Sequence, residues 1–575
     1  MNKHKQLPYG VSDYISVRER DLYYVDKTMY LPKLEESADF LFFIRPRRFG
    51  KSLFINMMRA YYDKSLKDRF EELFGGTWIG KHPTPLQGRY QVLHLDFSRI
   101  GSKMATIEHD FNDYCNSQLD AFMRRYGADY PQDVKDDFFA ANSTRLKFNI
   151  LNTAAQDSHI PLYLIIDEYD NFTNVILNKE GEEVYHAITH ADGFYCDVFK
   201  LFKGMFERIF LIGVSPVTLD DLTSGFNIAT NISMNPVFDK MLGFSTEEVR
   251  EMFSYFKESG QLRPDCDIEA MIEEMKPWYD GYCFAKQCLK SDVRVFNSDM
   301  VLYYLRSQIQ TGEAPEQMID PNTKTDYNKM KRLLQLDLLS GDRKHVLKRI
   351  TEEGKILGNV TESFPARMLT EPNMFVSLLF YYGMLTIGGT FGEQLILTIP
   401  NNNVRKQYYG YLLEMYQAQH NIDTTYLSTL YTYMAMEGKW EDALRFIADA
   451  YAAQSSVRDA VEGERNLQGF LLGYLSLTNY YYTAPELELN HGYCDFFLLP
   501  DLTHYQSKHS YILELKYLPK KDFASKAEAQ WAEAVEQIRG YAVAPRVEKL
   551  RQGTQLHKIV MQFEGWELRR MEEID

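Results

Sequence analysis

The sequence predicts an α/β protein with several domains, and three observations support this fold class. In the first half, short apolar runs alternate with amphipathic helical stretches, which is typical of a parallel sheet covered by helices on both faces. From about residue 246 the pattern is mainly helical, and the last hundred residues return to alternating strands. At 575 residues, the chain is also too long for one hydrophobic core.

The first half is expected to form the parallel sheet. Apolar runs predict its strands at residues 40–44, 90–97, 162–166 and 209–214. Between them, helical periodicity is clearest at residues 53–62 and 107–125.

The second half changes character twice. Ser245 begins a capping-box pattern at the start of the helical region, and Asp280-Gly281 marks a turn. Residues 310–330 are polar and contain proline, which favours a surface loop, and helical patterning resumes over 401–476. The tail then predicts four strands and one helix, at residues 480–489, 494–499, 510–517, 526–541 (the helix) and 557–563.

We expect four parts from these changes. They are an α/β core at 1–245, a mainly helical lid at 246–400, a helical connector at 401–460 and a second α/β domain at 461–575.

Composition excludes several classes of protein. The net charge of −16 disfavours a basic, non-specific nucleic-acid coat protein, and the 14% aromatic content disfavours long disordered regions. The six cysteines form no CxxC pair, which favours reduced thiols in a cytoplasmic protein over a zinc site. The N-terminus shows no signal-peptide pattern, and glycines and polar residues interrupt the longest apolar tract, 375–391, so we expect no membrane span.

The most informative motif is Arg45-Pro-Arg-Arg-Phe-Gly-Lys-Ser-Leu53, which follows the first predicted strand. An apolar strand, a short loop and Gly50 opening a helix are the layout of a phosphate-binding loop. Lys51 is expected to reach the terminal phosphates of ATP, and Ser52 to ligate Mg²⁺. The pattern is incomplete, because Arg45 stands where such loops usually have their first glycine.

Arginines give this loop an unusual charge density. Arg45, Arg47 and Arg48 either bind phosphate or lie on the surface, and we expect phosphate contact from at least one of them. We assign Arg47 and Arg48 to the nucleotide site.

A second strand ends in two acids, Asp167 and Glu168. Ligands bind at the carboxyl ends of parallel strands, so Asp167 is expected to help hold Mg²⁺ and Glu168 to orient the attacking water. Taken alone, the pair is also compatible with two exposed acids at a turn. Ser215, at the exit of the next strand, is either a sensor of the terminal phosphate or a simple strand-end serine.

The tail carries a different chemistry. Asp495 opens an apolar strand, and Glu514 and Lys516 share one face of the next strand because side chains alternate along it. Two carboxylates on adjacent strands can share a divalent metal, and Lys516 would polarise water or stabilise charge on a phosphate. An E-x-K triplet is also often a plain cross-strand ion pair.

The loop motif closely resembles that of the bacterial AAA-ATPase-like family, in which the missing first glycine is usual. Further motifs of that family occur in order over residues 6–300: Tyr24-Val-Asp-Lys-Thr28, Asp167-Glu-Tyr-Asp170, Gly213-Val-Ser-Pro216, Ser224-Gly-Phe-Asn227 and Trp278-Tyr-Asp-Gly-Tyr282. The resemblance implies a P-loop NTPase sheet that binds ATP.

Residues 461–563 resemble the PD-(D/E)xK nuclease-like domain that commonly follows this ATPase-like domain. The resemblance adds Glu464 on the first helix, and Gln537 and Tyr541 on the helix after the ExK strand, to the site. It also matches Glu488 and Gly492 before Asp495. Relatives usually have Gly-Arg where this chain has Gly492-Tyr493, and the lost cation puts substrate engagement more in question than metal binding.

These motifs support two functions. The first is an ATP-binding, ATP-hydrolysing protein coupled to a Mg²⁺- or Mn²⁺-dependent nuclease domain that acts on nucleic acid. The second is a nucleotide-switched regulatory protein with an inert nuclease fold. A metabolic kinase is disfavoured, because no acceptor-site motif is found and the tail would remain unexplained. A homo-oligomer, with an arginine finger from a neighbouring subunit, stays open.

Overall fold

The computed structural model describes residues 4–575 with internal gaps. The gaps are 102–105, 172–193, 217–228, 292–293, 316, 321–345, 348, 352, 365–367, 369–370, 418–422, 454–463 and 490–491. Contacts divide the chain into two compact units, Met1–Arg343 with Leu357–Asn402, and Lys344–Ile356 with Asn403–Asp575.

The first unit is built on a five-stranded parallel sheet of order β2-β3-β4-β1-β5. Its strands are β1 (Phe40–Ile44), β2 (Gln91–Asp96), β3 (Leu162–Asp167), β4 (Arg208–Gly213) and β5 (Thr230–Asn231). The four longer strands confirm the sequence prediction. Strands β1, β3 and β4 are mostly apolar and buried, as expected for a sheet covered on both faces, whereas β2 also carries Gln91, His94 and Asp96.

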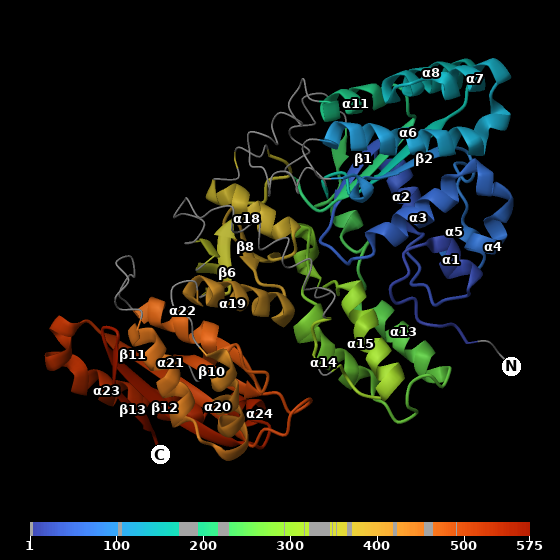
Figure 1. Ribbon diagram of the computed structural model, residues 1–575. Coiled ribbons are helices and arrows are strands. Elements are labelled where there is room, and N and C mark those ends of the chain that lie inside the picture. The colour runs from blue at the N-terminus through green and yellow to red at the C-terminus, as the bar shows by residue number, and fades with distance from the viewer. Residues whose placement is uncertain are drawn as a thin grey trace. The chain divides into compact units, whose positions relative to one another are not determined.

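Helices pack on this sheet between the strands. Helix α3 packs against β2 and β3, α6 packs against β2, and α8 packs on α6 (Figure 1). The helices of this part are α1 (Tyr14–Glu19), α2 (Tyr30–Ser37), α3 (Lys51–Tyr62), α4 (Phe70–Phe74), α5 (Trp78–Lys81), α6 (Ile107–Tyr126), α7 (Gln132–Ala140), α8 (Thr144–Asp157) and α11 (Phe194–Phe202).

The rest of the first unit is mainly helical, with one hairpin. Helix α13 starts with a complete capping box, in which the Ser245 hydroxyl accepts from the Glu248 amide and the Glu248 carboxylate accepts from the Ser245 amide. The elements are α13 (Thr246–Glu258), α14 (Ile268–Tyr279), α15 (Ser298–Thr311), α18 (Pro372–Tyr381), β7 (Thr386–Phe391) and β8 (Gln394–Thr398); strand β6 (Lys355–Gly358) lies at the boundary between the units.

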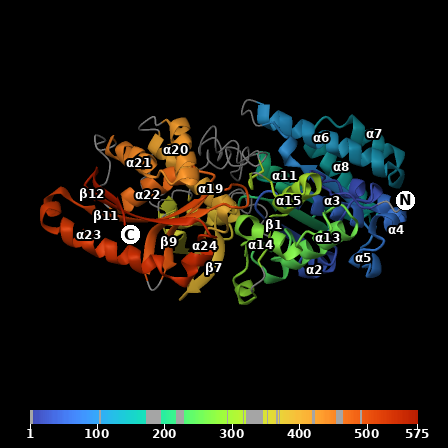
Figure 2. The same ribbon diagram turned by 90° about the horizontal axis from the view of Figure 1, so that it is seen from below.

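The second unit contains a mixed five-stranded sheet of order β13-β12-β11-β10-β9, in which only β11 and β12 pair in parallel. Helices α20, α21 and α22 cover one face and α23 covers the other (Figure 2). The elements are α19 (Asn402–Gln417), α20 (Thr424–Glu437), α21 (Glu441–Ala453), α22 (Glu464–Leu475), β9 (Tyr481–Leu489), β10 (Gly492–Pro500), β11 (His509–Leu518), α23 (Lys520–Ala542), α24 (Pro545–Leu550), β12 (Gln555–Glu564) and β13 (Glu567–Glu573).

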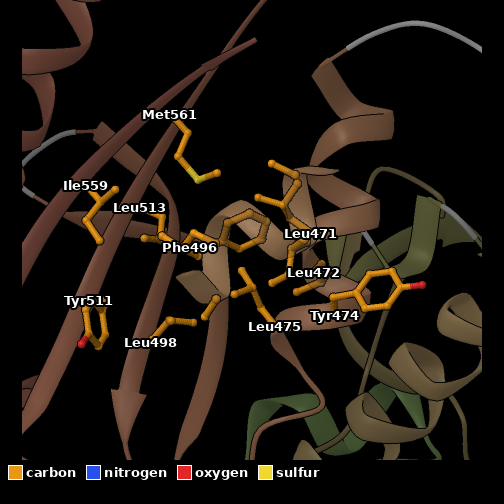
Figure 3. Close-up of a cluster of buried hydrophobic side chains, with 14 of the residues drawn as sticks. Leu471, Leu472, Tyr474, Leu475, Phe496, Leu498, Tyr511, Leu513, Ile559 and Met561 are labelled. Atoms are coloured by element: carbon orange, nitrogen blue, oxygen red, sulfur yellow. The ribbon is translucent and has the colours of Figure 1, made fainter. Parts of the chain in front are cut away.

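The core of this unit explains why the tail strands alternate. Leu471 and Leu475 of α22 pack on Phe496, Leu498 and Leu513 of the sheet (Figure 3). On the opposite face, Ile512 and Val560 pack against Ala534 and Ile538 of α23.

Strand β13 was not predicted from the sequence. Six of its seven residues are charged or only partly covered, and only Met571 is buried. An edge strand with charged side chains lacks the apolar alternation that marks an inner strand.

Candidate active sites

The loop after β1 has the backbone of a phosphate-binding loop. Gly50 adopts a left-handed conformation with φ of +88°, and α3 begins at Lys51 immediately after it. Arg48 is also left-handed, with φ of +66°, which is uncommon for a residue other than glycine. The helix therefore starts directly at the residue predicted to bind phosphate.

Lys51 is held inside this loop. Its amine donates to the carbonyl oxygens of Arg45 at 3.1 Å and Pro46 at 2.9 Å. Burial lowers the pKa of Lys51, and the nearby carboxylates of Glu168 and Asp167 act in the opposite direction. The cation is thus placed between the loop and the acids that follow β3.

Ser52 and Asp167 come together although they are 115 residues apart. The Ser52 hydroxyl donates to Asp167 Oδ2 at 2.9 Å, while Asp167 Oδ1 is buried without a hydrogen-bond partner among the described residues. Burial raises the pKa of Asp167 to about 6. A hydroxyl beside a carboxylate with an unsatisfied oxygen is a donor set that suits Mg²⁺.

Glu168 lines a cavity that also contains Lys51 and Ser52, and its backbone is left-handed, with φ of +49°. The residues after it keep this conformation in place. The Asp170 carboxylate is buried and accepts from the amides of Val214 and Ser215, the latter at 2.7 Å, and the Tyr169 hydroxyl donates to the Ser215 carbonyl at 2.6 Å. The exits of β3 and β4 are therefore locked to each other.

Ser215 is one of the residues that form these hydrogen bonds. It is fully buried and makes a side-chain hydrogen bond with Tyr382, and it does not line the cavity that contains Lys51. Its predicted role as a phosphate sensor thus remains a prediction, and its position in the structure is that of a packing residue.

Arg45 has a structural role. Its guanidinium is buried and donates to the carbonyls of Ser233 at 2.6 Å and Phe238 at 3.1 Å. It also lies between the rings of Phe43 and Phe284, at 4.2 and 4.1 Å from their centroids. Arg45 points into the core, so phosphate contact from the loop is left to Arg47 and Arg48, which line the cavity.

The cavity above the loop has a volume of about 430 Å³. One part of its wall is polar and includes Arg47, Arg48, Lys51, Ser52 and Glu168. Another part is apolar and is formed by Pro8, Val11, Tyr23, Val25, Met241, Leu242, Phe244 and Leu302. A cavity lined by both charged and apolar side chains has the mixed chemistry that the phosphates and base of a nucleotide require.

Two of the other motifs support the walls of this cavity. The Lys27 amine lies 2.6 Å from Glu248 Oε1 and also donates to the Lys240 carbonyl, which ties the N-terminal segment to α13. Tyr282 packs edge-on against Phe49 of the loop, with ring centroids 4.9 Å apart. The predicted motif at 224–227 lies outside the described residues.

In the second unit, Asp495 sits where two strands separate. The β10–β11 ladder pairs Phe496 with Leu513, and one step further the Leu515 amide donates to Asp495 Oδ2 at 2.6 Å instead of to a strand carbonyl. Gln468, one turn after the start of α22, donates to Asp495 Oδ1 at 2.5 Å. The carboxylate therefore fills the fork between the strands.

Glu514 and Lys516 lie beside this fork. Lys516 Nζ and Glu514 Oε1 are 2.9 Å apart, and Glu514 Oε2 is buried without a hydrogen-bond partner in the described part of the chain. Burial and the charge of Asp495 raise the pKa of Glu514 to about 7, and burial raises that of Asp495 to about 6. Two carboxylates in one low-dielectric site both resist ionisation, as they do where a cation is to be bound.

Of the remaining predicted residues, Glu464 and Tyr541 lie close enough to these three for their charges to interact, whereas Gln537 has its printed contact on its own helix. Glu464 is exposed at the start of α22, and its charge acts on the pKa values of Asp495 and Lys516. Gln537 donates to Glu533 at 3.4 Å on α23, and its Oε1 is buried without a partner among the residues described. Tyr541, one turn later, has its pKa raised to about 12 by burial and by Glu514.

Sequence reasoning missed three site residues. Gln468 was detectable as the residue one helical turn after Glu464, but glutamine carries no charge signal. Tyr169 and Asp170 were noted only as parts of a motif, and their partners just after β4 lie 44 to 46 residues away.

Around the second site, the exposed cations are mostly paired. Lys520 lies 3.8 Å from Glu567, and Lys526 lies 3.4 Å from Asp522. Tyr493, where the resemblance to the nuclease-like domain implies an arginine, is 62% exposed. Within the described ranges, no three or more His, Cys, Asp or Glu side chains form a ready-made metal cluster, so any ion here would rest on the two carboxylates and further ligands.

Comparison with known proteins identifies a domain near each end of the chain. Residues 8–223 match the family model described as predicted AAA-ATPase, and residues 462–573 match the PD-(D/E)XK nuclease superfamily. The chain joins an AAA-ATPase-like domain to a PD-(D/E)XK nuclease-superfamily domain. The two resemblances seen in the sequence are thereby confirmed.

Individual relatives add little about the activity of this chain. An uncharacterized protein in the vnfD 5' region of Azotobacter chroococcum mcd 1 is 25% identical over 287 residues, and this chain spans about half the length (48%) of that relative. The solved structure of the Aeropyrum pernix ORC1 protein in complex with DNA covers 66% of this chain and 89% of its own, at 10% identity and a TM-score of 0.23. A score this low does not establish a shared fold. No helix in the described ranges is both long and apolar enough to cross a bilayer.

Proposed function

We propose that this protein binds and hydrolyses ATP in its first unit and cleaves nucleic acid in its second, with a divalent metal ion in each site. The observation that carries the nuclease proposal is the meeting of Asp495, Glu514 and Lys516 at the fork between β10 and β11. The cavity at Lys51 and the Ser52–Asp167 contact support the ATPase.

In the ATPase site, each residue has a distinct role. Backbone amides at Gly50 and the start of α3, with Lys51, Arg47 and Arg48, bind the phosphates. Ser52 and Asp167 would hold Mg²⁺, which neutralises phosphate charge, and Asp167 has the unsatisfied oxygen that such a role requires. Glu168 orients the attacking water.

In the nuclease site, Asp495 and Glu514 would hold Mg²⁺ or Mn²⁺, which activates water and stabilises charge on the phosphate. Gln468 and the Leu515 amide fix the Asp495 carboxylate. Lys516 orients the water or stabilises the phosphate charge, and Glu464 and Gln537 complete the rim. With these roles, we expect the phosphodiester bond to be attacked beside these side chains, at the edge of the sheet between α22 and α23.

A metal-dependent cleavage assay tests this proposal. The full-length protein is incubated with single- and double-stranded DNA and RNA and with Mg²⁺ or Mn²⁺. Cleavage is expected in wild type and is expected to fall at least about a hundredfold in Glu514→Gln and Lys516→Ala, since each removes a group that acts on the reacting atoms. Lys520→Ala is the matched control, because this lysine is exposed and paired outside the site. Cleavage that survives both site variants would contradict the assignment.

One observation favours a second candidate, a nucleotide-switched regulatory protein with an inert nuclease fold. Tyr493 replaces the cation that relatives place beside the metal site. This alternative predicts tight ATP binding and no cleavage with either metal, and Tyr493→Arg then offers a direct test of whether the lost cation is the cause.

A further inference from the structure

The phosphate loop is held by a helix that is distant in sequence. The first residues of α15 contact Arg48, 250 residues away: the Ser298 hydroxyl donates to the Arg48 carbonyl at 3.1 Å, and the Asp299 amide donates to it at 3.3 Å. These contacts hold the left-handed backbone of Arg48. Helix α15 is thereby docked on the loop that is proposed to bind phosphate.

The strongest of these contacts is ionic. Arg48 Nη1 lies 2.7 Å from Asp299 Oδ2, and both side chains are only partly covered, at 26% and 22% exposure. Both residues line the cavity that contains Lys51, Ser52 and Glu168. Arg48 therefore belongs to the wall of the proposed phosphate site while its guanidinium is paired with a carboxylate.

Phosphate oxygens and the Asp299 carboxylate have the same chemistry toward an arginine. Both are anions that accept paired hydrogen bonds from its planar fork. They also repel each other across a cavity of this size. Binding of a triphosphate and the Arg48–Asp299 ion pair are therefore opposed.

We propose that Asp299 competes with the nucleotide phosphates for Arg48, so that α15 loosens from the loop when a triphosphate binds. This inference rests on the proposed nucleotide site and adds its regulation. In this proposal, α15 is the element that responds to bound phosphate. It packs on α14 in the helical part of the first unit.

Nucleotide affinity of the full-length protein tests the competition. Asp299→Asn is expected to bind ATP about two- to fivefold tighter than wild type, the range that a partly exposed ion pair allows, and to leave AMP binding unchanged. Asp299→Glu keeps an anion and is expected to show no gain. Glu269→Gln removes the same charge from an exposed pair with Arg250 outside the cavity, and it controls for net charge.

A double variant separates competition from a general effect of charge. In Arg48→Ala, the further change Asp299→Asn is expected to give no gain in ATP affinity. Hydrogen exchange gives a reading that does not depend on any substitution: ATP is expected to speed exchange of the amides in the first turn of α15 in the wild-type protein. Because Ser298 and the Asp299 amide still hold the loop backbone, Asp299→Asn is expected to keep its melting temperature.

The outcomes are distinct. Equal or weaker ATP binding by Asp299→Asn, or α15 amides protected by ATP, would overturn the competition and show that Asp299 only orients Arg48. If wild type binds no ATP, or if Lys51→Ala binds as tightly as wild type, the nucleotide site itself is wrong and the inference falls with it.

Discussion

Arg45 shows how one residue in a binding motif can serve the core instead of the ligand. The usual phosphate-binding loop has a glycine at this position. Here the Arg45 side chain is fixed by three carbonyl contacts and two aromatic neighbours. Lys51, six residues later, is held by the same loop but lines the cavity. The two cations of one motif thus have different consequences when removed.

We expect Arg45→Ala to destabilise the protein by about 3 kcal/mol, because the carbonyls of Ser233 and Phe238 lose a buried charged donor. Lys51→Ala is expected to abolish ATP binding with a small change in melting temperature. Thermal unfolding and nucleotide titration of both variants measure the contrast. Equal melting temperatures for the two variants would contradict the core role of Arg45.

His94 on β2 sets an acid limit on stability. Burial lowers its pKa to about 4, from an ordinary value near 6.5, and its Nε2 has no hydrogen-bond partner among the described residues. Between these two pH values the unfolded chain binds more protons than the folded one, so stability is complete above pH 6.5 and falls as the pH drops toward 4. His94→Gln is expected to flatten the melting temperature between pH 7 and 5, and an unchanged slope would exclude His94 as the cause.

At the scale of elements, the segments that follow β3 and β4 are held together by hydrogen bonds and close packing. Gly213 is required there because a Cβ atom would lie 2.4 Å from Asp170 Oδ1 and 2.5 Å from the Tyr169 ring. The same close packing recurs in the second unit, where a Cβ at Gly492 would lie 2.7 Å from the Tyr541 ring. Both glycines lie next to residues assigned to a site, so their role is close approach and not only turn formation.

Gly213→Ala is therefore expected to lower ATP hydrolysis more than ATP binding, since it displaces the segment that carries Glu168 while leaving Lys51 in place. A destabilisation of about 1–3 kcal/mol is expected from overpacking. Gly204→Ala is the control, because its backbone is left-handed at φ +86° but no atom lies within 4 Å of the added Cβ. Equal effects of the two substitutions on hydrolysis would show that the close contact with Asp170 and Tyr169 is not responsible.

At the scale of the whole molecule, the two candidate sites belong to separate compact units, and one of the places where the chain passes between the units is the start of α19. The Trp278–Tyr282 motif lies near that junction along the first unit: the Asn401 amide donates to the Asp280 carbonyl at 2.9 Å, and Tyr282 packs on Phe49 of the phosphate loop. This chain of contacts connects the loop to the last residues before the second unit. We propose that ATP in the first unit controls cleavage in the second.

This control predicts that ATP changes the cleavage rate of wild type at least about threefold, and that Lys51→Ala keeps basal cleavage but loses the response to ATP. Tyr282→Phe keeps the ring contact with Phe49 but removes its hydrogen bond with Asn401, and it is expected to bind ATP normally with a weaker response. Cleavage rates with and without ATP measure both effects. An ATP response that persists in Lys51→Ala would contradict control through this site.

The sequence alone was enough to predict the four long parallel strands, the phosphate loop, the acids after β3 and the E-x-K strand, because each depends on local apolar runs and short spacings. The roles of Arg45, Asp170, Gln468 and Asp299 were decided by the tertiary structure. Each acts through a partner between about 27 and 251 residues away, and only the packing of distant elements brings such groups together. Local pattern therefore indicated the candidate phosphate and metal sites, whereas the fold decided which charged residues line the cavity and which are buried in the core beside it.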